Sequence, residues 1–264
     1  MKAYLKATDA ARRRCNSVRR LRELDPLPAG SLRESSGHLN LILAPKAVRY
    51  DRREPLTEPR FVFLEGCVRS ETRFDPPHFP VVDGPLIYMS FGSLGAIDTH
   101  LIERMIDVFE TLPARFLINV GGFLEAYQRV PDNVILGSWF PQPSVVAQSA
   151  LFIHHGGNNS YCEALYHGVP SLVMPYCWDG HDNAQRAQAT GTGHSMHRSN
   201  WTPEELKSTV LAMLQDVEMQ ERLKAISDAM KTAPCTSHSA TAVMHAIHSN
   251  AHLNSRVCLD LIDR

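Results

Sequence analysis

A run of histidine, glycine and asparagine stands between an expected buried strand and an expected helix, as His154-His155-Gly156-Gly157-Asn158-Asn159-Ser160. Two adjacent glycines allow the backbone to approach a ligand closely, and the free N–H groups of a first helical turn attract an anion. His155 could add a hydrogen bond or a positive charge, while Asn159 and Ser160 could cap the helix. The pattern predicts a diphosphate site, and a plain helix cap beside a buried histidine is the alternative.

Metal binding is a second alternative for the paired histidines, with Cys162 or His181 as a further ligand. It is not favoured, because neither His154 nor His155 belongs to an H-x-x-x-H pair and no cysteine spacing matches a zinc site. The six cysteines are scattered without a C-x-x-C pair. This scatter argues against a disulfide framework and a zinc ribbon and favours a reducing compartment, so we expect a cytoplasmic protein without a metal.

Two earlier loops also follow expected strands. Gly92-Ser93-Leu94-Gly95 could cradle a phosphate with backbone N–H groups, although ordinary strand-to-helix turns use the same residues. Trp139-Phe140-Pro141-Gln142 offers a flat surface on which an aromatic base could stack. Taken alone, such a tryptophan is more often part of a core.

A fourth loop, Pro175 to Ala184, carries Asp179 and Asp182 after another expected strand. Their carboxylates could accept hydrogen bonds from sugar hydroxyls or cap the next helix. For Asp182 we favour the cap.

Short apolar runs alternate with helical stretches from residue 86 onwards. Buried strands are expected at 86–91, 115–120, 134–136, 151–154 and 171–174. Helices are expected at 98–111, 142–149, 159–167, 182–190, 203–215, 217–231 and 237–249. This alternation predicts the α/β class with a doubly wound parallel sheet, in which ligands bind beyond the carboxyl ends of the strands.

The N-terminal part follows a different pattern, with a helix expected at 2–24 and short extended segments at 39–43 and 60–64. These elements are too few to close a core alone. Prolines exclude a helix in the segment that follows. We therefore predict four parts, an N-terminal remnant at 1–73, a linker at 74–85, a main domain at 86–250 and a tail at 251–264.

Charge is balanced overall, with a formal net charge of −1, which argues against a nucleic-acid partner. Residues 1–60 nevertheless hold 14 Lys and Arg against 7 Asp and Glu. An organelle transit peptide would explain the arginines between Arg12 and Arg22, but the acidic residues around them fit it badly, so we favour a solvated basic helix face. No run approaches the roughly 18 apolar residues of a membrane span.

The combined spacing resembles a known signature. Trp139-x-Pro-Gln142, His155-Gly-Gly-x-Asn159-Ser160-x-x-Glu163, Gly168-Val-Pro170, Pro175 and Asp179 are similar to the nucleotide-sugar motif of family 1 UDP-dependent glycosyltransferases. The register resembles the bacterial macrolide-type and related microbial branch. The likeness covers about residues 80 to 250, which implies the Rossmann-like donor-binding half of the two-domain GT-B fold.

That resemblance implies inverting, metal-independent transfer of a hexose from a UDP-sugar to a hydroxyl of a small lipophilic or phenolic acceptor. The UDP-sugar is then a co-substrate, and no cofactor is implied. The residues implied as donor contacts are Ser93, Trp139, Phe140, Gln142, His155, Gly156, Gly157, Asn159, Ser160, Glu163 and Asp179.

Their implied roles follow the parts of the ligand. Trp139 would stack on uracil, and the backbone around Phe140 would read its edge. Gln142 and Glu163 would hold the ribose hydroxyls. A dTDP-sugar could stack on Trp139 equally well, so the nucleotide and the sugar stay open.

His155, Asn159 and Ser160 would bind the diphosphate, with Ser93 at the opposite loop, and Asp179 would contact the sugar. Gly180 stands where the family usually has Gln, so one sugar contact is lost unless His181 or Asp182 replaces it.

The larger departure lies at the front of the chain. Residues 1–73 resemble only the tail of the family's N-terminal acceptor domain, which supplies the catalytic histidine, so that base is expected to be missing and His38 is not assigned to it. Two hypotheses follow. One is a truncated glycosyltransferase, and the other is a catalytically silent nucleotide-sugar-binding module that a separate acceptor-binding chain or self-association completes.

Overall fold

The computed structural model describes residues 2–29, 36–50, 54–66, 68–80 and 83–254. The chain divides into two compact units. One comprises residues 1–41, 56–62 and 242–264, and the other comprises residues 42–55 and 63–241. The predicted division at residues 73, 85 and 250 stays a prediction, and the tail at 255–264 lies outside the described residues.

The first unit contains α1 (Lys2–Leu21), whose arginines include the exposed Arg13 and Arg14. The amide of Asn16 on this helix is buried and pairs with the backbone of Leu27, from whose N–H it accepts at 2.7 Å and to whose carbonyl it donates at 3.2 Å. This pair stabilises the turn that ends the helix. Strands β1 (Asn40–Ile42) and β2 (Phe61–Phe63), whose last residues are counted with the second unit, form a two-stranded sheet close to the expected extended segments.

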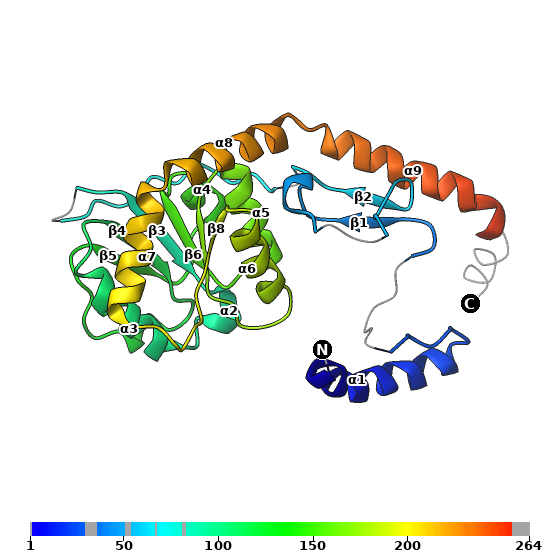
Figure 1. The fold of residues 1–264 in the computed structure, drawn as a ribbon, viewed down its shortest axis with the longest axis horizontal. Helices are drawn as coiled ribbons and strands as arrows, with labels where there is room; N and C mark the ends of the chain where they lie inside the picture. Colours follow the sequence, from blue (N-terminus) through cyan, green and yellow to red (C-terminus); the bar gives the residue numbers. More distant parts are fainter. Residues whose placement is uncertain (1, 30–35, 51–53, 67, 81–82, 255–264) are drawn as a thin grey trace. The chain divides into compact units, whose positions relative to one another are not determined.

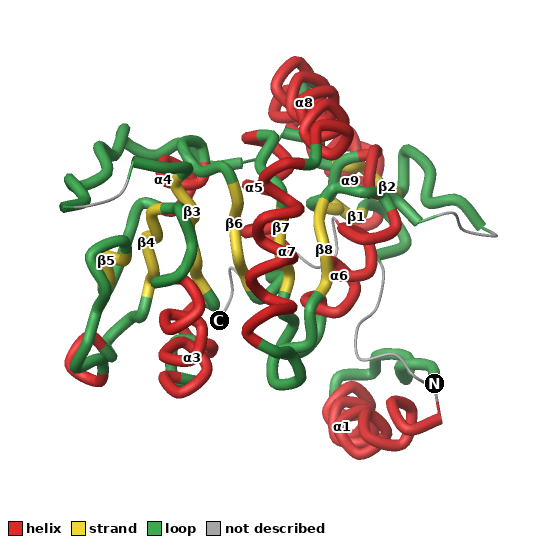
Figure 2. The backbone as a smooth tube through the Cα atoms, turned by 60° about the vertical axis from the view of Figure 1, so that its left-hand side comes forward, coloured by secondary structure: helices red, strands yellow, loops and turns green. Residues whose placement is uncertain are grey.

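The second unit is built on a six-stranded parallel sheet in the order β5-β4-β3-β6-β7-β8 (Figure 2). The strands are β3 (Leu86–Ser90), β4 (Arg115–Asn119), β5 (Val134–Gly137), β6 (Leu151–His154), β7 (Ser171–Val173) and β8 (Gly193–Ser195). The α/β class and the parallel sheet are confirmed, and all five expected strands are present. The short strand β8 was not expected, because Gly193-His194-Ser195 has no apolar run and two of its residues are exposed.

Helices alternate with these strands along the chain (Figure 1). They are α2 (Gly92–Gly95), α3 (Thr99–Phe109), α4 (Gln142–Val146), α5 (Asn158–His167), α6 (Asp179–Ala189), α7 (Pro203–Gln215), α8 (Val217–Thr232) and α9 (Cys235–Asn254), with single 3-10 turns at Lys46–Val48 and Leu124–Ala126. Capping residues in the sequence determine where two of these helices begin. Asp98 caps α3 by accepting from the N–H of Leu101, and Thr202 and Glu205 form a reciprocal capping box at α7.

The sheet is buried on both faces, as the apolar runs predict. Ile87 and Met89 of β3 point into one apolar cluster together with residues of α3 and α7, whereas Tyr88 belongs to a second cluster on the other face with Val145 of α4. Because successive side chains of a strand point to opposite faces, a single strand supplies both cores.

Strand order also determines where a ligand can bind. The chain runs outward from β3 through β4 to β5, then returns to place β6 on the other side of β3. The strand order therefore reverses between β3 and β6, and the crevice beyond their carboxyl ends is the expected ligand position.

Candidate functional site

The loops after β3 and β6 meet at the imidazole of His155. A Cβ built on Gly92 would lie 3.2 Å from Cε1 of this ring, and one on Gly157 would lie 2.4 Å from Nε2. Gly92 also has a φ of +68°. The positive φ therefore favours glycine at position 92, whereas a side chain at position 157 would require the His155 ring to move. Ser93, exposed in the first turn of α2, lies next to Gly92 at the same crevice.

Burial lowers the pKa of His155, while the nearby carbonyl of Ser90 and the carboxylate of Asp179 act in the opposite direction. The ring is thus held toward its neutral form in the absence of a ligand. Its neighbour His154 is fully buried, and burial lowers its pKa to about 3. The Nδ1 atom of His154 accepts a hydrogen bond of 3.0 Å from the N–H of Gly156, so this histidine holds the loop from inside the fold.

Gly156 and Gly180 bring the backbone of the loop after β6 close to the backbone of the first turn of α6. A Cβ on Gly156, whose φ is +82°, would lie 2.7 Å from the Gly180 carbonyl oxygen. A Cβ on Gly180 would lie 2.6 Å from the carbonyl oxygen of His155. In this packing no side chain fits at position 180, which gives a physical reason for the glycine that departs from the family pattern.

Helix α5 begins at Asn158 with Gly157 as its N-cap, so the prediction that Asn159 or Ser160 caps this helix is wrong. The N–H of Asn158 instead donates to Oδ2 of Asp179 at 2.8 Å. That carboxylate comes from the first residue of α6, and a contact between distant segments cannot be predicted from local spacing.

Helix α6 starts at Asp179, three residues before the expected position, with Trp178 as its N-cap. Asp182 lies inside the first turn, so the prediction that it caps the helix is wrong as well. Trp178 has a φ of +49°, an unusual conformation for a residue with a side chain.

The second part of the site joins α4 to α5. Nε2 of Gln142 donates to Oε2 of Glu163 at 2.6 Å and to Oγ of Ser160 at 3.1 Å. Glu163 is only 4% exposed, and this burial raises its pKa, whereas the hydrogen bond from Gln142 and the charge of Arg69 lower it. A buried carboxylate with free acceptor capacity is thereby fixed beside the first turn of α5.

The loop after β5 places two aromatic residues differently. Trp139 is 65% exposed, so its ring is not part of the core. Phe140 is buried and packs edge-on against Phe74 and Tyr88, with ring centroids 5.8 and 6.0 Å away. Phe140 therefore anchors the loop while the ring of Trp139 faces solvent.

The structure brings most of the predicted residues together through these contacts. Gly156, Gly157 and Asp179 gather around the start of α5 with His155, while Gln142, Ser160 and Glu163 form a hydrogen-bonded group. Asn159 is exposed in the first turn of α5 between the two groups. Asn183 was not predicted as a site residue, although its amide is buried. Its position one turn into α6, which begins at Asp179, is the feature of the sequence that could have indicated it.

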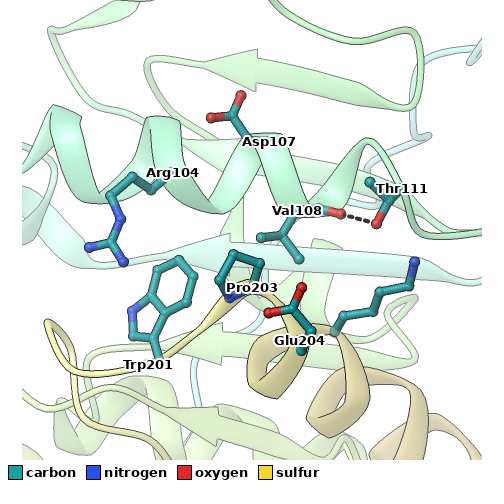
Figure 3. Close-up of a pocket in the computed structure, with 8 residues that line it drawn as sticks. Arg104, Asp107, Val108, Thr111, Trp201, Pro203 and Glu204 are labelled. Carbon is teal, nitrogen blue, oxygen red and sulfur yellow. Dashed lines mark hydrogen bonds between the residues drawn. The ribbon is translucent and has the colours of Figure 1, made fainter.

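Two open cavities lie elsewhere in this unit. One, of about 420 Å³, is lined by the second half of α3 and the first turn of α7, where the Arg104 guanidinium lies 4.4 Å from the Trp201 ring centroid (Figure 3). The other, of about 400 Å³, is lined by residues 68–71 and 73 and by parts of α4 and α5. None of the predicted site residues lines either cavity.

Within the described residues no three His, Cys, Asp or Glu side chains gather as a candidate metal site. Among the same residues, no helix has the length and apolar character to cross a bilayer.

The sequence is similar to one protein family model and to several curated proteins. Residues 107–245 match the family model described as erythromycin biosynthesis protein CIII-like, C-terminal domain. NDP-glycosyltransferase YjiC of Bacillus subtilis is 25% identical over 225 residues, which are 84% of this chain and 57% of that protein. The 3-alpha-mycarosylerythronolide B desosaminyl transferase of Saccharopolyspora erythraea is 29% identical over 194 residues, 72% of this chain and 45% of the relative.

Among solved structures, the glycotransferase of kitacinnamycin shares the fold with a TM-score of 0.79 at 24% identity, over 90% of this chain and 62% of that chain. The present chain spans about half the length of the curated relatives that it matches.

Proposed function

The chain belongs to the erythromycin biosynthesis protein CIII-like glycosyltransferases, whose C-terminal domain it matches, and from this membership we propose that it binds a nucleoside-diphosphate sugar for transfer to a small-molecule acceptor. The observation that supports this proposal most is the hydrogen bond of 2.6 Å from Gln142, the first residue of α4, to the buried Glu163 on α5. A buried carboxylate beside a helix N-terminus suits a ligand that has both hydroxyls and an anionic group.

The nucleoside end of the ligand is assigned to α4, α5 and the loop before α4. Trp139 stacks on the base, with Phe140 holding the loop in place. Glu163 and Gln142 bind the ribose hydroxyls, which take over the hydrogen bonds that Gln142 now gives to Glu163 and Ser160. The base is uracil in this proposal, and thymine fits the same platform.

The diphosphate is assigned to the crevice between the loops after β3 and β6. The backbone at Gly156 and Gly157, the first turn of α5 with Asn159 and Ser160, the ring of His155 and, across the crevice, Ser93 supply its hydrogen bonds. Asp179 accepts from a sugar hydroxyl, while Gly180 offers backbone alone.

The proposed reaction is an inverting displacement at the anomeric carbon. The acceptor hydroxyl forms the new bond to this carbon, its proton passes to a base, and the bond to the diphosphate oxygen breaks. His155 and the N–H groups of α5 stabilise the negative charge that develops on the departing nucleotide. We assign the base to no residue of this chain.

We also propose an acceptor class, a location and a partner for the chain. The acceptor is a small lipophilic or phenolic alcohol, no cofactor takes part, and nucleic acid is not a partner. A cytoplasmic location is proposed because Cys15, Cys162 and Cys177 are free thiols, which suit a reducing compartment. A separate acceptor-binding chain or self-association is proposed as the source of groups that complete the reaction.

Calorimetric titration of UDP, UDP-glucose and dTDP-glucose into the purified chain tests the donor site. A donor-hydrolysis assay and a transfer assay against phenols and macrolides follow. We expect saturable binding of at least one nucleotide. If the chain binds a nucleotide but turns over no donor, only the hypothesis of a catalytically silent nucleotide-sugar-binding module remains. If none of the three ligands binds, the proposal is wrong.

A further inference from the structure

The side-chain amide of Asn183 on α6 lies directly behind the proposed diphosphate loop. It is completely buried, at 0% exposure. Its Nδ2 donates to the carbonyl of Gly156 at 2.8 Å, and its Oδ1 accepts from Nη1 of Arg186 at 3.0 Å. A buried amide bonded at both ends cannot rotate without leaving polar groups unsatisfied, so its orientation is fixed.

Gly156 is consequently held from two sides. Its N–H donates to His154 of β6, and its carbonyl accepts from Asn183 of α6. The peptide bond that follows is planar and trans, so the carbonyl of Gly156 and the N–H of Gly157 point in opposite directions. A carbonyl turned inward toward Asn183 therefore turns the N–H of Gly157 away from α6.

Arg186 continues the network to a segment far earlier in the chain. Its guanidinium lies 4.6 Å from the centroid of the Tyr50 ring, and the Tyr50 hydroxyl donates to the carbonyl of Asp182 at 2.8 Å. The neighbouring Leu43 carbonyl accepts from Nδ2 of Asn158 at 2.7 Å. Residues 43 and 50 thus support the starts of both α5 and α6.

We propose that Asn183 is a positioning residue for the diphosphate, because it fixes the Gly156 peptide and so aims the N–H of Gly157 at the phosphates. Arg186 and Tyr50 hold Asn183 in the required orientation. This inference rests on the proposed function, since it presumes that the loop receives a diphosphate.

The test compares UDP with uridine, which lacks the phosphates, in calorimetric or competition titrations. Asn183→Ala removes the amide without adding a charge that would repel the ligand. We expect UDP affinity to fall about tenfold or more, the equivalent of at least about 1.4 kcal/mol, while uridine affinity stays within about twofold. A selective loss for UDP is a result that general destabilisation does not produce.

Asn133→Ala is the matched control. Asn133 is 4% exposed and its Nδ2 donates to the carbonyls of Phe109, Leu112 and Ala114 at 2.8, 3.3 and 3.1 Å, at the opposite end of the sheet from the loops. We expect its variant to lose thermal stability while the ratio of UDP to uridine affinity is unchanged.

Arg186→Lys is the second variant, for the case that Asn183→Ala does not fold. It retains the positive charge but removes the planar donor group, and we expect UDP to weaken about threefold with uridine unchanged. A constant affinity ratio in the folded variants, or parallel losses for both ligands, would overturn the positioning role. If the wild-type chain binds neither ligand, it is the proposed function that fails.

Discussion

Asp179 and Asn158 join the first residues of α6 and α5 through one hydrogen bond, in which the carboxylate Oδ2 accepts from the backbone N–H at 2.8 Å. The N-terminus of α5 therefore already holds an anion that belongs to the protein. If the proposed diphosphate binds at the same helix end, it meets this negative charge, while the attached sugar meets a hydrogen-bond acceptor.

Replacing Asp179 with Ala is expected to separate the repulsion between its carboxylate and the diphosphate from the hydrogen bond that it accepts from the sugar. UDP without a sugar should bind about twofold to fivefold more tightly, because roughly 0.3–1 kcal/mol of like-charge interaction at the helix end is removed. The preference for UDP-glucose over UDP should fall at the same time. Titrations of both ligands measure the change.

Asp216→Ala controls for the loss of a capping carboxylate, because Asp216 accepts from the N–H of Met219 at 2.8 Å at the start of α8. Both variants should lose stability, but only Asp179→Ala should alter binding. Unchanged UDP and UDP-glucose affinities in Asp179→Ala would contradict the assignment of this carboxylate.

Trp139→Ala should weaken UDP binding by about 1–3 kcal/mol, the range for losing a stacking aromatic contact. Because the ring is exposed in the absence of ligand, the melting temperature should stay nearly constant. Trp139→Tyr retains a flat ring and should recover most of the affinity. Titration and circular dichroism of the three proteins check this, and equal affinities would remove Trp139 from the site.

Glu163→Gln should bind UDP more weakly by about 1–3 kcal/mol yet be as stable as the wild type or more so. The reason is that burial raises the pKa of Glu163 above its ordinary value of 4.5. A carboxyl with a raised pKa favours folding in its protonated form, so this stabilisation is lost as the pH rises from about 4.5 through the folded-state pKa.

Thermal melts at several pH values measure the effect. Relative to Glu163→Gln, the wild-type protein should lose stability across that interval and then level off. A wild-type curve that gains stability relative to the variant over the same interval would show that the carboxylate is stabilised, against the direction given by its burial.

Gly180→Ala should destabilise the fold by about 1–3 kcal/mol, because its Cβ would lie 2.6 Å from the His155 carbonyl oxygen. The shift of that backbone should also weaken UDP binding. Gly122→Ala is the matched control, since a Cβ there meets open space among the described residues. Denaturant unfolding and UDP titration measure both effects, and equal behaviour of the two variants would contradict the close backbone contact.

Binding should not need a divalent metal, because the proposal assigns the phosphates to the backbone N–H groups at the start of α5 and to His155. EDTA should leave the UDP dissociation constant within about twofold, well below the tenfold change that 1.4 kcal/mol represents. A large loss that magnesium or manganese reverses would disprove this prediction.

The sequence predicted the sheet well, because parallel strands buried on both faces leave continuous apolar runs such as Leu86 to Phe91. Strand β8 carried no such run. The starts of α5 and α6 were misjudged for another reason, since they depend on Asp179 and Trp178 acting across or between loops. Asn183 was missed because its partners, Gly156 and Arg186, are revealed only when α6 packs against the loop after β6.

The reversal of strand order between β3 and β6 also has a consequence for how the protein acquires its site. The two strands pair side by side, yet the segment between them contains β4, β5 and three helices. Such long-range pairing is slow, because the entropy of closing a large loop is lost before the contact forms. We therefore expect the crevice to assemble late in folding, so that a ligand bound there would slow unfolding while leaving the rate of refolding unchanged.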